Sequence, residues 1–309
     1  MWSQLRGWTA TIGVLAAVLL TAACHVATQA AAPGGASTTA NPVTTASAAS
    51  AGPILALGDS YTAGGLYPTD SQAKPPGCLR STKSYPVLVA KALHAQLTSV
   101  ACTNAGVNMM TSAQKTYLGT NPAQLTAVKA DDRLILLTLG GDDLGFLNVL
   151  QECMKVSVSD PSGSPCQAHY TAGGTDQLAA NVTAEAAKIA QVLTEIRARA
   201  PQARVVVVGY PDLFPQSGSC WPAVPLATGD ITYLRGIEVK SNAMLAADAA
   251  TAGDTFVNTY TPTIGHDFCQ PESNRDVEGL LPGSLALPFH PNARGQQAMA
   301  NAVLAALKS

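Results

Sequence analysis

The segment RVVVVG at residues 204–209 is the clearest buried strand in the sequence. Two other apolar runs have the same character: RLILLTL at residues 133–139 and PILALG at residues 53–58. Runs of valine, isoleucine and leucine with few polar residues between them are typical of strands that are buried on both faces. These three segments therefore predict a parallel sheet that is covered by helices on both faces.

Helical segments separate the strands along the chain. This alternation indicates an α/β fold, in which functional residues lie beyond the carboxyl ends of the strands. The chain has no internal repeat and no second linker, so residues 53–309 are expected to form one domain. Four segments have apolar residues at helical spacing: residues 84–95, 175–200, 228–252 and 292–307. Residues 97–102 and 255–260 are expected as further strands.

Charge and motif content exclude several classes of function. The formal net charge is −2, so no basic surface for nucleic acid is expected. The sequence lacks the glycine-rich dinucleotide and phosphate-loop motifs and the commonest zinc-binding patterns. We therefore expect no cofactor and no metal. No apolar run reaches the ~20 residues of a membrane-spanning helix.

Residues 1–23 have the pattern of an export signal: Arg6 near the start, an apolar stretch too short to span a bilayer, and small residues at the end. Cys24 follows and resembles the cysteine of a bacterial lipobox, although Thr21 stands where leucine is usual. We expect a lipid on Cys24 to anchor the protein at the outer face of the cell membrane; simple secretion is the alternative. Residues 24–52 are rich in Ala, Thr, Ser, Gly and Pro, cannot bury enough apolar surface to fold, and are expected to form a flexible tether.

Cysteine content supports export independently. The chain has seven cysteines, and six remain when Cys24 is set aside as the lipid site. An even number of cysteines in an exported chain predicts three disulfides, although spacing alone leaves their pairing open. Free buried thiols are the alternative.

The chemistry is expected where the strand of residues 53–58 ends. Ser60 follows this strand in the run GDS, where a tight turn would present the hydroxyl at the edge of the sheet. Thr62 replaces the second glycine of a G-x-S-x-G elbow, so the usual α/β-hydrolase is not expected. A serine nucleophile needs a base within hydrogen-bond reach. Three of the five histidines lie in the tether, a helix and a cysteine-bounded loop, which leaves His266 and His290 as candidate bases.

Five segments occur in a characteristic order: ALGDSYTAGG (56–65), LTLGGDDLGF (137–146), VVVVGYPDLFP (205–215), IGHDFC (264–269) and FHPNARGQQAMA (289–300). They resemble the GDSL or SGNH hydrolase family, especially the extracellular esterases and lipases of actinobacteria. The resemblance implies a flavodoxin-like, three-layer α/β sandwich and a carboxylic ester hydrolase, with Ser60 as nucleophile and His290 as general base. It gives His266 a structural or substrate-lining role. It also implies the disulfides Cys78–Cys102, Cys153–Cys166 and Cys220–Cys269.

Two departures from the family concern main-chain groups. Leu287 stands where the family often has the aspartate that orients the histidine. A carbonyl oxygen can accept the imidazole Nδ1–H instead, so the resemblance implies a Ser–His dyad that is oriented by the Leu287 carbonyl. The glycine that donates an N–H to the oxyanion in the family is matched by Gly106, or by Met109 in another alignment. We take Gly106, together with the Ser60 N–H, as oxyanion donors.

A third departure is Asp142, which replaces the asparagine whose amide completes the family's oxyanion hole. An ionised carboxylate ~4 Å from the oxyanion would repel it by about 4 kcal/mol, roughly a thousandfold in rate. A protonated Asp142 would instead donate a hydrogen bond, and burial can raise a carboxyl pKa far enough. Three interpretations follow: Asp142 is a neutral oxyanion donor, the enzyme is slow, or the side chain turns away and caps a helix that starts near Leu144.

Taken together, the residues predict an exported serine esterase or lipase that acts on small-molecule or lipid esters as a monomer. Tyr61, Tyr210, Phe268 and Phe289 lie near the matching segments and are candidates for the acyl pocket, with core packing as the alternative. Two other functions stay open. A non-catalytic binder of lipid or glycan would keep the fold despite the altered oxyanion hole. An acyltransferase would use the same residues while excluding water from the acyl-enzyme.

Overall fold

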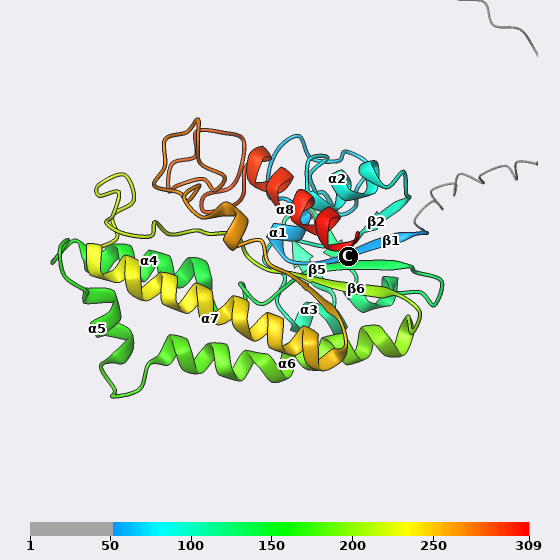
Figure 1. Ribbon diagram of the computed structural model, residues 1–309, viewed down its shortest axis with the longest axis horizontal. Coiled ribbons are helices and arrows are strands. Elements are labelled where there is room, and N and C mark those ends of the chain that lie inside the picture. The colour runs from blue at the N-terminus through cyan, green and yellow to red at the C-terminus, as the bar shows by residue number, and fades with distance from the viewer. Residues whose placement is uncertain (1–51, 309) are drawn as a thin grey trace, which may run out of the picture. The chain divides into compact units, whose positions relative to one another are not determined.

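A computed structural model describes residues 52–308 of the 309-residue chain (Figure 1). The predicted export signal, the lipidation site Cys24 and the predicted tether up to residue 51 lie outside the described residues. Within residues 52–308, no helix is both long and apolar enough to cross a membrane.

Parallel strands form the middle layer of the fold: β1 (Ile54–Gly58), β2 (Leu97–Ser99), β5 (Leu134–Thr138), β6 (Arg204–Val208) and β7 (Thr255–Val257). Their order across the sheet is β2-β1-β5-β6-β7. The three central strands are the three apolar runs expected from the sequence. In register, Ile135 pairs with Leu55 on one side and Val205 on the other. The outer strands are shorter than expected, since β2 and β7 each pair with their one neighbouring strand over three residues.

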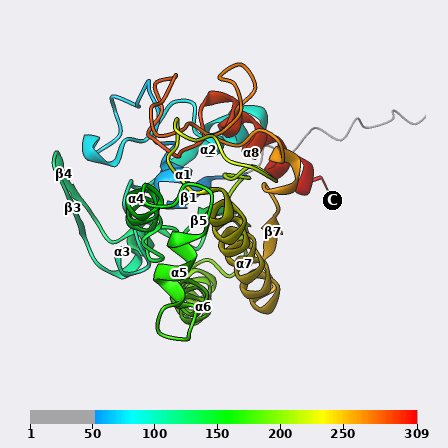
Figure 2. The same ribbon diagram turned by 90° about the vertical axis from the view of Figure 1, so that its left-hand side faces the viewer.

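Helices cover both faces of the sheet, which is the three-layer α/β sandwich predicted from the sequence. The helices are α1 (Ser60–Ala63), α2 (Tyr85–Ala92), α3 (Asn108–Thr111), α4 (Phe146–Ser157), α5 (Pro165–Thr171), α6 (Gln177–Arg199), α7 (Thr228–Ala252) and α8 (Ala293–Ala306). Single 3₁₀ turns occupy Pro76–Cys78, Gln124–Ala127 and Thr261–Thr263. Helices α2 and α8 pack together on one face, and α6 and α7 lie on the other (Figures 1 and 2).

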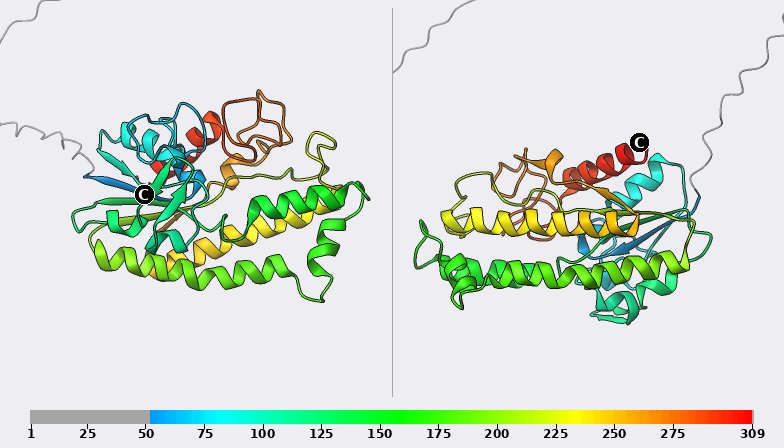
Figure 3. Two further views of the ribbon diagram at one scale, coloured as in Figure 1. Left: turned by 180° about the vertical axis from the view of Figure 1, so that it is seen from behind. Right: turned by 60° about the horizontal axis from the view of Figure 1, so that its bottom comes forward.

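The two long helices reach beyond the sheet. Helices α6 and α7 have 23 and 25 residues, which at the helical rise is about 35 Å each, whereas a five-residue strand spans about 17 Å. Both helices therefore extend past the carboxyl edge of the sheet, where α4 and α5 pack against them (Figures 1 and 3). This projecting group of helices forms a wall next to the end of β1.

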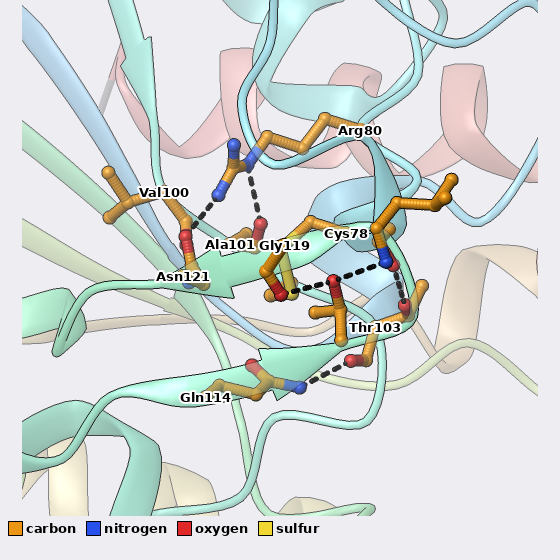
Figure 4. Close-up of a disulfide and its surroundings, with 12 residues drawn as sticks. Cys78, Arg80, Val100, Ala101, Thr103, Gln114, Gly119 and Asn121 are labelled. Atoms are coloured by element: carbon orange, nitrogen blue, oxygen red, sulfur yellow. Dashed lines mark hydrogen bonds between the residues drawn. A yellow bond between two sulfur atoms is a disulfide. The ribbon is translucent and has the colours of Figure 1, made fainter.

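A short antiparallel hairpin, β3 (Gln114–Thr116) and β4 (Gly119–Asn121), was not expected from the sequence. The buried Arg80 side chain, which is only 6% exposed, contacts this hairpin. Its guanidinium donates to the Ala101 carbonyl at 2.7 Å and to the Asn121 side chain at 2.6 Å (Figure 4). Arg80 therefore joins the hairpin to the segment after β2.

Three disulfides are present among the described residues, and they are the pairs that the family resemblance implies. Cys78–Cys102 lies beside Arg80 (Figure 4), and the Cys102 N–H donates to the Gly58 carbonyl at 3.0 Å. This hydrogen bond links the disulfide-bonded segment at Cys102 to Gly58, the last residue of β1. The other two pairs are Cys153–Cys166, which joins α4 to α5, and Cys220–Cys269.

Candidate active site

Ser60 is the first residue of α1, directly beyond the carboxyl end of β1, and is 7% exposed. Gly58 makes the turn with a φ of +122°, and a side chain there would collide with the Thr138 carbonyl on the neighbouring strand. Asp59 caps the helix, since its side chain accepts the Tyr61 N–H at 2.9 Å. The turn therefore places the Ser60 hydroxyl at the edge of the sheet.

His290 lies directly against this serine. Its Nε2 is 2.8 Å from Ser60 Oγ, and its Nδ1 bonds the Pro288 carbonyl oxygen at 2.7 Å. A carbonyl oxygen can only accept, so Nδ1 carries the proton and Nε2 is free to accept one from the serine. Burial lowers the pKa of His290, opposed by its bond to the Pro288 carbonyl, and so favours the neutral base.

The prediction that the Leu287 carbonyl orients the imidazole is wrong. That carbonyl accepts the main-chain N–H of His290 at 3.2 Å instead. The reason is the backbone of Phe289, whose φ of +58° is unusual for a residue other than glycine. The chain turns at this residue. His290 Nδ1 therefore bonds the carbonyl of Pro288, two residues before it, and not that of Leu287, three residues before it.

Main-chain and side-chain bonds hold Phe289 in this conformation, which costs of order 1–3 kcal/mol in isolation. The Tyr61 hydroxyl donates to the Phe289 carbonyl at 2.8 Å. The main chain of Glu278 pairs with the same segment: its carbonyl accepts the Phe289 N–H at 3.1 Å, and its N–H donates to the His290 carbonyl at 2.9 Å. Hydrogen bonds thus join the helix that carries Ser60 to the loop that carries His290.

The Glu278 side chain stabilises the same loop from within. It is fully buried and forms an ion pair with Arg275 at 2.5 Å. It also accepts hydrogen bonds from Ser284 at 2.8 Å and Asn292 at 3.0 Å. Burial alone would raise the pKa of Glu278, but these hydrogen bonds and the Arg275 charge outweigh it and lower the pKa. Glu278 is therefore ionised in the folded protein.

Asp142 lines the same cavity as Ser60. Burial and, secondly, the neighbouring Asp143 raise its pKa to about 7. The capping alternative is wrong, because α4 begins two residues later than expected, at Phe146, and its N-cap residue Gly145 has no side-chain cap. Asp142 is thus a half-buried carboxyl group that is partly neutral near pH 7.

Gly106 has a packing role. The Asp143 carboxylate accepts the Val107 N–H with both oxygens, at 3.0 and 2.9 Å. An added Cβ at Gly106 would lie 2.6 Å from the Asp143 Oδ1 atom, so a side chain there would displace this carboxylate. Neither Gly106 nor Met109 is among the described residues that line the cavity. A role for Gly106 in the oxyanion hole stays a prediction.

An apolar cavity opens beside Ser60 and is lined by residues of α4, α6 and α7. Figure 2 shows α4 beside α1, with α6 and α7 lower in the view. Tyr61 and Tyr210 line the cavity, whereas Phe268 and Phe289 pack ring to ring at 5.6 Å and do not. Most of the residues that line the cavity were not identified from the sequence, because they have only the ordinary apolar spacing of buried helices. The wall includes Phe146, Leu147, Leu178, Phe214, Leu234 and Ile237.

Two further polar side chains have defined contacts in the structure, one that was not singled out from the sequence and one for which a structural or substrate-lining role was left open. Glu238, on α7, lies in its wall and accepts the Leu213 N–H at 3.1 Å. Burial and the charge of Asp212 raise the pKa of Glu238 well above its usual range. His266 does not line the cavity; its Nδ1 bonds the Asn274 carbonyl at 2.6 Å, which gives it a structural role.

A parallel α/β sheet with a hydrogen-bonded serine and histidine at its carboxyl edge, beside an apolar cavity, is the arrangement of a serine hydrolase. Comparison with known proteins supports the same class of protein. The chain belongs to the GDSL-like lipase/acylhydrolase family, whose model matches residues 56–298. It is therefore a carboxylic ester hydrolase.

Similar proteins come from Streptomyces. Lipase 2 of Streptomyces coelicolor is 40% identical over 251 residues, 80% of this chain and 82% of that protein. The extracellular lipase of Streptomyces rimosus superimposes with a TM-score of 0.68 at 30% identity, covering 83% of this chain and 100% of that one. The phospholipase A1 of Streptomyces albidoflavus has the same TM-score at 27% identity, covering 84% and 98%.

Proposed function

We propose that the protein hydrolyses carboxylic esters with Ser60 and His290 as a catalytic dyad, through an acyl-enzyme on Ser60. The main support is the 2.8 Å hydrogen bond between Ser60 Oγ and His290 Nε2 at the wall of an apolar cavity. A third side chain is not needed to orient the base, because the Pro288 carbonyl fixes the imidazole through Nδ1.

The reaction runs in two halves. In acylation, His290 takes the proton of Ser60 Oγ as that oxygen attacks the ester carbonyl; the ester C–O bond then breaks, and the leaving alcohol takes the proton from His290. In deacylation, a water molecule gives a proton to His290 and attacks the acyl carbon. The bond from the acyl carbon to Ser60 Oγ breaks, and His290 returns the proton to the serine. Each half begins with a neutral imidazole, which burial favours.

Asp142 supplies the side-chain donor of the oxyanion hole in this proposal, together with the Ser60 N–H. The carboxylic acid has the length of the amide that it replaces and can donate only while it is protonated. Its pKa of about 7 supports a large neutral fraction at and below neutral pH. The enzyme is therefore expected to lose activity as Asp142 ionises.

The cavity supports an ester with an apolar acyl chain as substrate, because its walls are mostly aliphatic and aromatic. The Streptomyces rimosus relative is described as an extracellular lipase. We propose that this chain also acts outside the cell, after export directed by residues 1–23. In this proposal a lipid on Cys24 anchors it, residues 24–52 form the tether, and residues 53–309 form the catalytic domain.

The test is hydrolysis of short and medium p-nitrophenyl esters from about pH 5 to 9. Ser60→Ala should lose all activity above the uncatalysed background. Ser219→Ala is the matched control, since the Ser219 hydroxyl contacts Thr228 at 3.3 Å outside the cavity. Turnover by Ser60→Ala equal to that of the wild type would refute the dyad. Analysis of products with an added alcohol acceptor separates a hydrolase from an acyltransferase.

A further inference from the structure

The Tyr210 hydroxyl joins the two loops that carry the candidate catalytic groups. Tyr210 follows β6 and is 7% exposed. Its hydroxyl donates to Asp59 Oδ2 at 2.5 Å and accepts the Gly141 N–H at 2.7 Å. Asp59 directly precedes Ser60, and Gly141 directly precedes Asp142. A single hydroxyl therefore links the turn of the nucleophile to the loop of the oxyanion donor.

Tyr210 is itself fixed from three sides. The Asn242 side chain on α7 accepts the Tyr210 N–H at 2.8 Å and donates to the Tyr210 carbonyl at 3.1 Å. The Tyr61 ring packs against the Tyr210 ring edge to face, with 4.9 Å between centroids. An added Cβ at Gly141 would lie 3.0 Å from the Tyr210 hydroxyl, so that position is packed tightly around the phenol. The main chain of Tyr210 is therefore held by Asn242 and its ring by Tyr61, which keeps the hydroxyl between the two loops.

Two carboxyl groups interact electrostatically next to this hydroxyl: Asp59, which accepts its hydrogen bond, and Asp142. Burial and the Asp142 charge raise the pKa of Asp59, while hydrogen bonds from Tyr210 and the Tyr61 N–H oppose this rise. Within residues 52–308, no comparable donor stabilises an ionised Asp142. The charge on each of these two carboxyl groups therefore affects the other. The other groups that face this pair are Asp143, Tyr61, Tyr210, Glu238 and His290.

We propose that Tyr210 is a positioning residue for ester hydrolysis: its hydroxyl holds the Asp59 turn and the Gly141 loop together and so positions Asp142 beside Ser60. The inference rests on the proposed role of Asp142 as a neutral oxyanion donor. Tyr210 acts through Asp59 and Gly141 and does not itself touch the reacting atoms in this account. A phenol is required because one group must donate to a carboxylate and accept from an N–H at the same time.

Tyr210→Phe tests the proposal by removing the hydroxyl and keeping the ring. We expect kcat to fall about tenfold to a hundredfold, the effect of losing a hydrogen bond to a charged group, with KM within about threefold of the wild type. The loss of activity at high pH should also begin at a lower pH, because losing this hydrogen bond raises the pKa of Asp59 and so weakens its repulsion of an ionised Asp142. Tyr233→Phe is the matched control: Tyr233 donates to Asp176 at 2.9 Å and does not line the cavity. It should keep the wild-type kcat and pH profile.

Asp59→Asn supplies a second test that does not depend on the stability of Tyr210→Phe. Asparagine cannot carry a charge at position 59, so nothing there opposes ionisation of Asp142, and the same shift of the high-pH limb to lower pH is expected. The double variant should show little further shift, since both changes break the same link. Thermal melting of each variant shows whether it is folded.

Two outcomes would overturn the inference. One is a folded Tyr210→Phe with the kcat and pH profile of the wild type, and the other is a double variant whose effects simply add. Labelling by a fluorophosphonate, which reacts with activated serines, distinguishes this failure from failure of the proposed function. One combination of results is labelling of the wild-type protein but not of Ser60→Ala, with a Tyr210→Phe that keeps the wild-type rate and pH profile. That combination would support the Ser60–His290 dyad and refute the role of Tyr210.

Discussion

Asp142→Asn should make the enzyme faster above neutral pH. Asparagine has the shape of the aspartic acid and donates through its amide at every pH. The native carboxyl group donates only while it is protonated, and once ionised it repels the oxyanion. The substitution therefore removes a pH dependence and leaves the geometry of the site unchanged.

The size of the effect follows from the pKa of Asp142, which burial and Asp143 raise to about 7. About nine tenths of the side chain is then neutral at pH 6, half at pH 7 and roughly one tenth at pH 8. The ratio of variant to wild-type kcat should rise from near one at pH 6 to about ten at pH 8. The low-pH limb should be common to both enzymes, because it reports His290, whose pKa burial lowers from 6.5.

The assay is kcat and KM for a p-nitrophenyl ester across this pH range, corrected for spontaneous hydrolysis. The wild type should show a bell-shaped profile, and Asp142→Asn should show only the rise at low pH. Asp160→Asn, in an exposed turn, is the control and should behave as the wild type. A variant slower than the wild type at pH 8 would refute the account of Asp142 as a neutral donor.

Three further predictions concern the loop of the base, the acyl cavity and acid stability. Tyr61→Phe leaves the Phe289 carbonyl without its donor, so a loss of about 1–3 kcal/mol in the free energy of unfolding and a fall in kcat are expected; denaturant unfolding and steady-state rates check this, and an unchanged kcat would contradict it. Ile237→Trp should fill the cavity and reduce hydrolysis of longer acyl esters relative to acetate, whereas Val239→Trp on the exposed side of α7 should not; equal chain-length profiles would show that the acyl chain binds elsewhere. Glu278→Gln should lower the melting temperature at neutral pH. Because folding lowers the pKa of Glu278, this difference from the wild type is fully present above its ordinary value of 4.5 and should shrink as pH falls below it; a difference that persists undiminished in acid would contradict the ion-pair account.

The sequence predicts the centre of the fold better than its edges. Strands β1, β5 and β6 are buried on both faces, so their side chains are nearly all apolar and the pattern is unmistakable. The hairpin of β3 and β4 was missed because its strands have three residues each and are largely polar. Its place depends on the distant Arg80 and Asn121 side chains, which no local pattern reveals.

The candidate site was predictable in its residue types but not in its connections. Ser60 and His290 stand out because of the motifs around them, although they are 230 residues apart in sequence. The Pro288 carbonyl could not be inferred, since the left-handed backbone of Phe289 has no glycine or asparagine to mark it. Similarly, the order of the strands brings the loops after β1, β5 and β6 together, but no pattern in the sequence indicates that the Tyr210 hydroxyl joins them.

The most direct test of the central claim is to trap the acyl-enzyme. The protein is mixed with an activated ester, quenched in acid within the first turnover and digested, and the peptides are weighed by mass spectrometry. The account predicts one acyl group on the peptide that contains Ser60, lost on longer incubation and absent in Ser60→Ala. An acyl group on another residue, or ester hydrolysis that continues undiminished in Ser60→Ala, would contradict it.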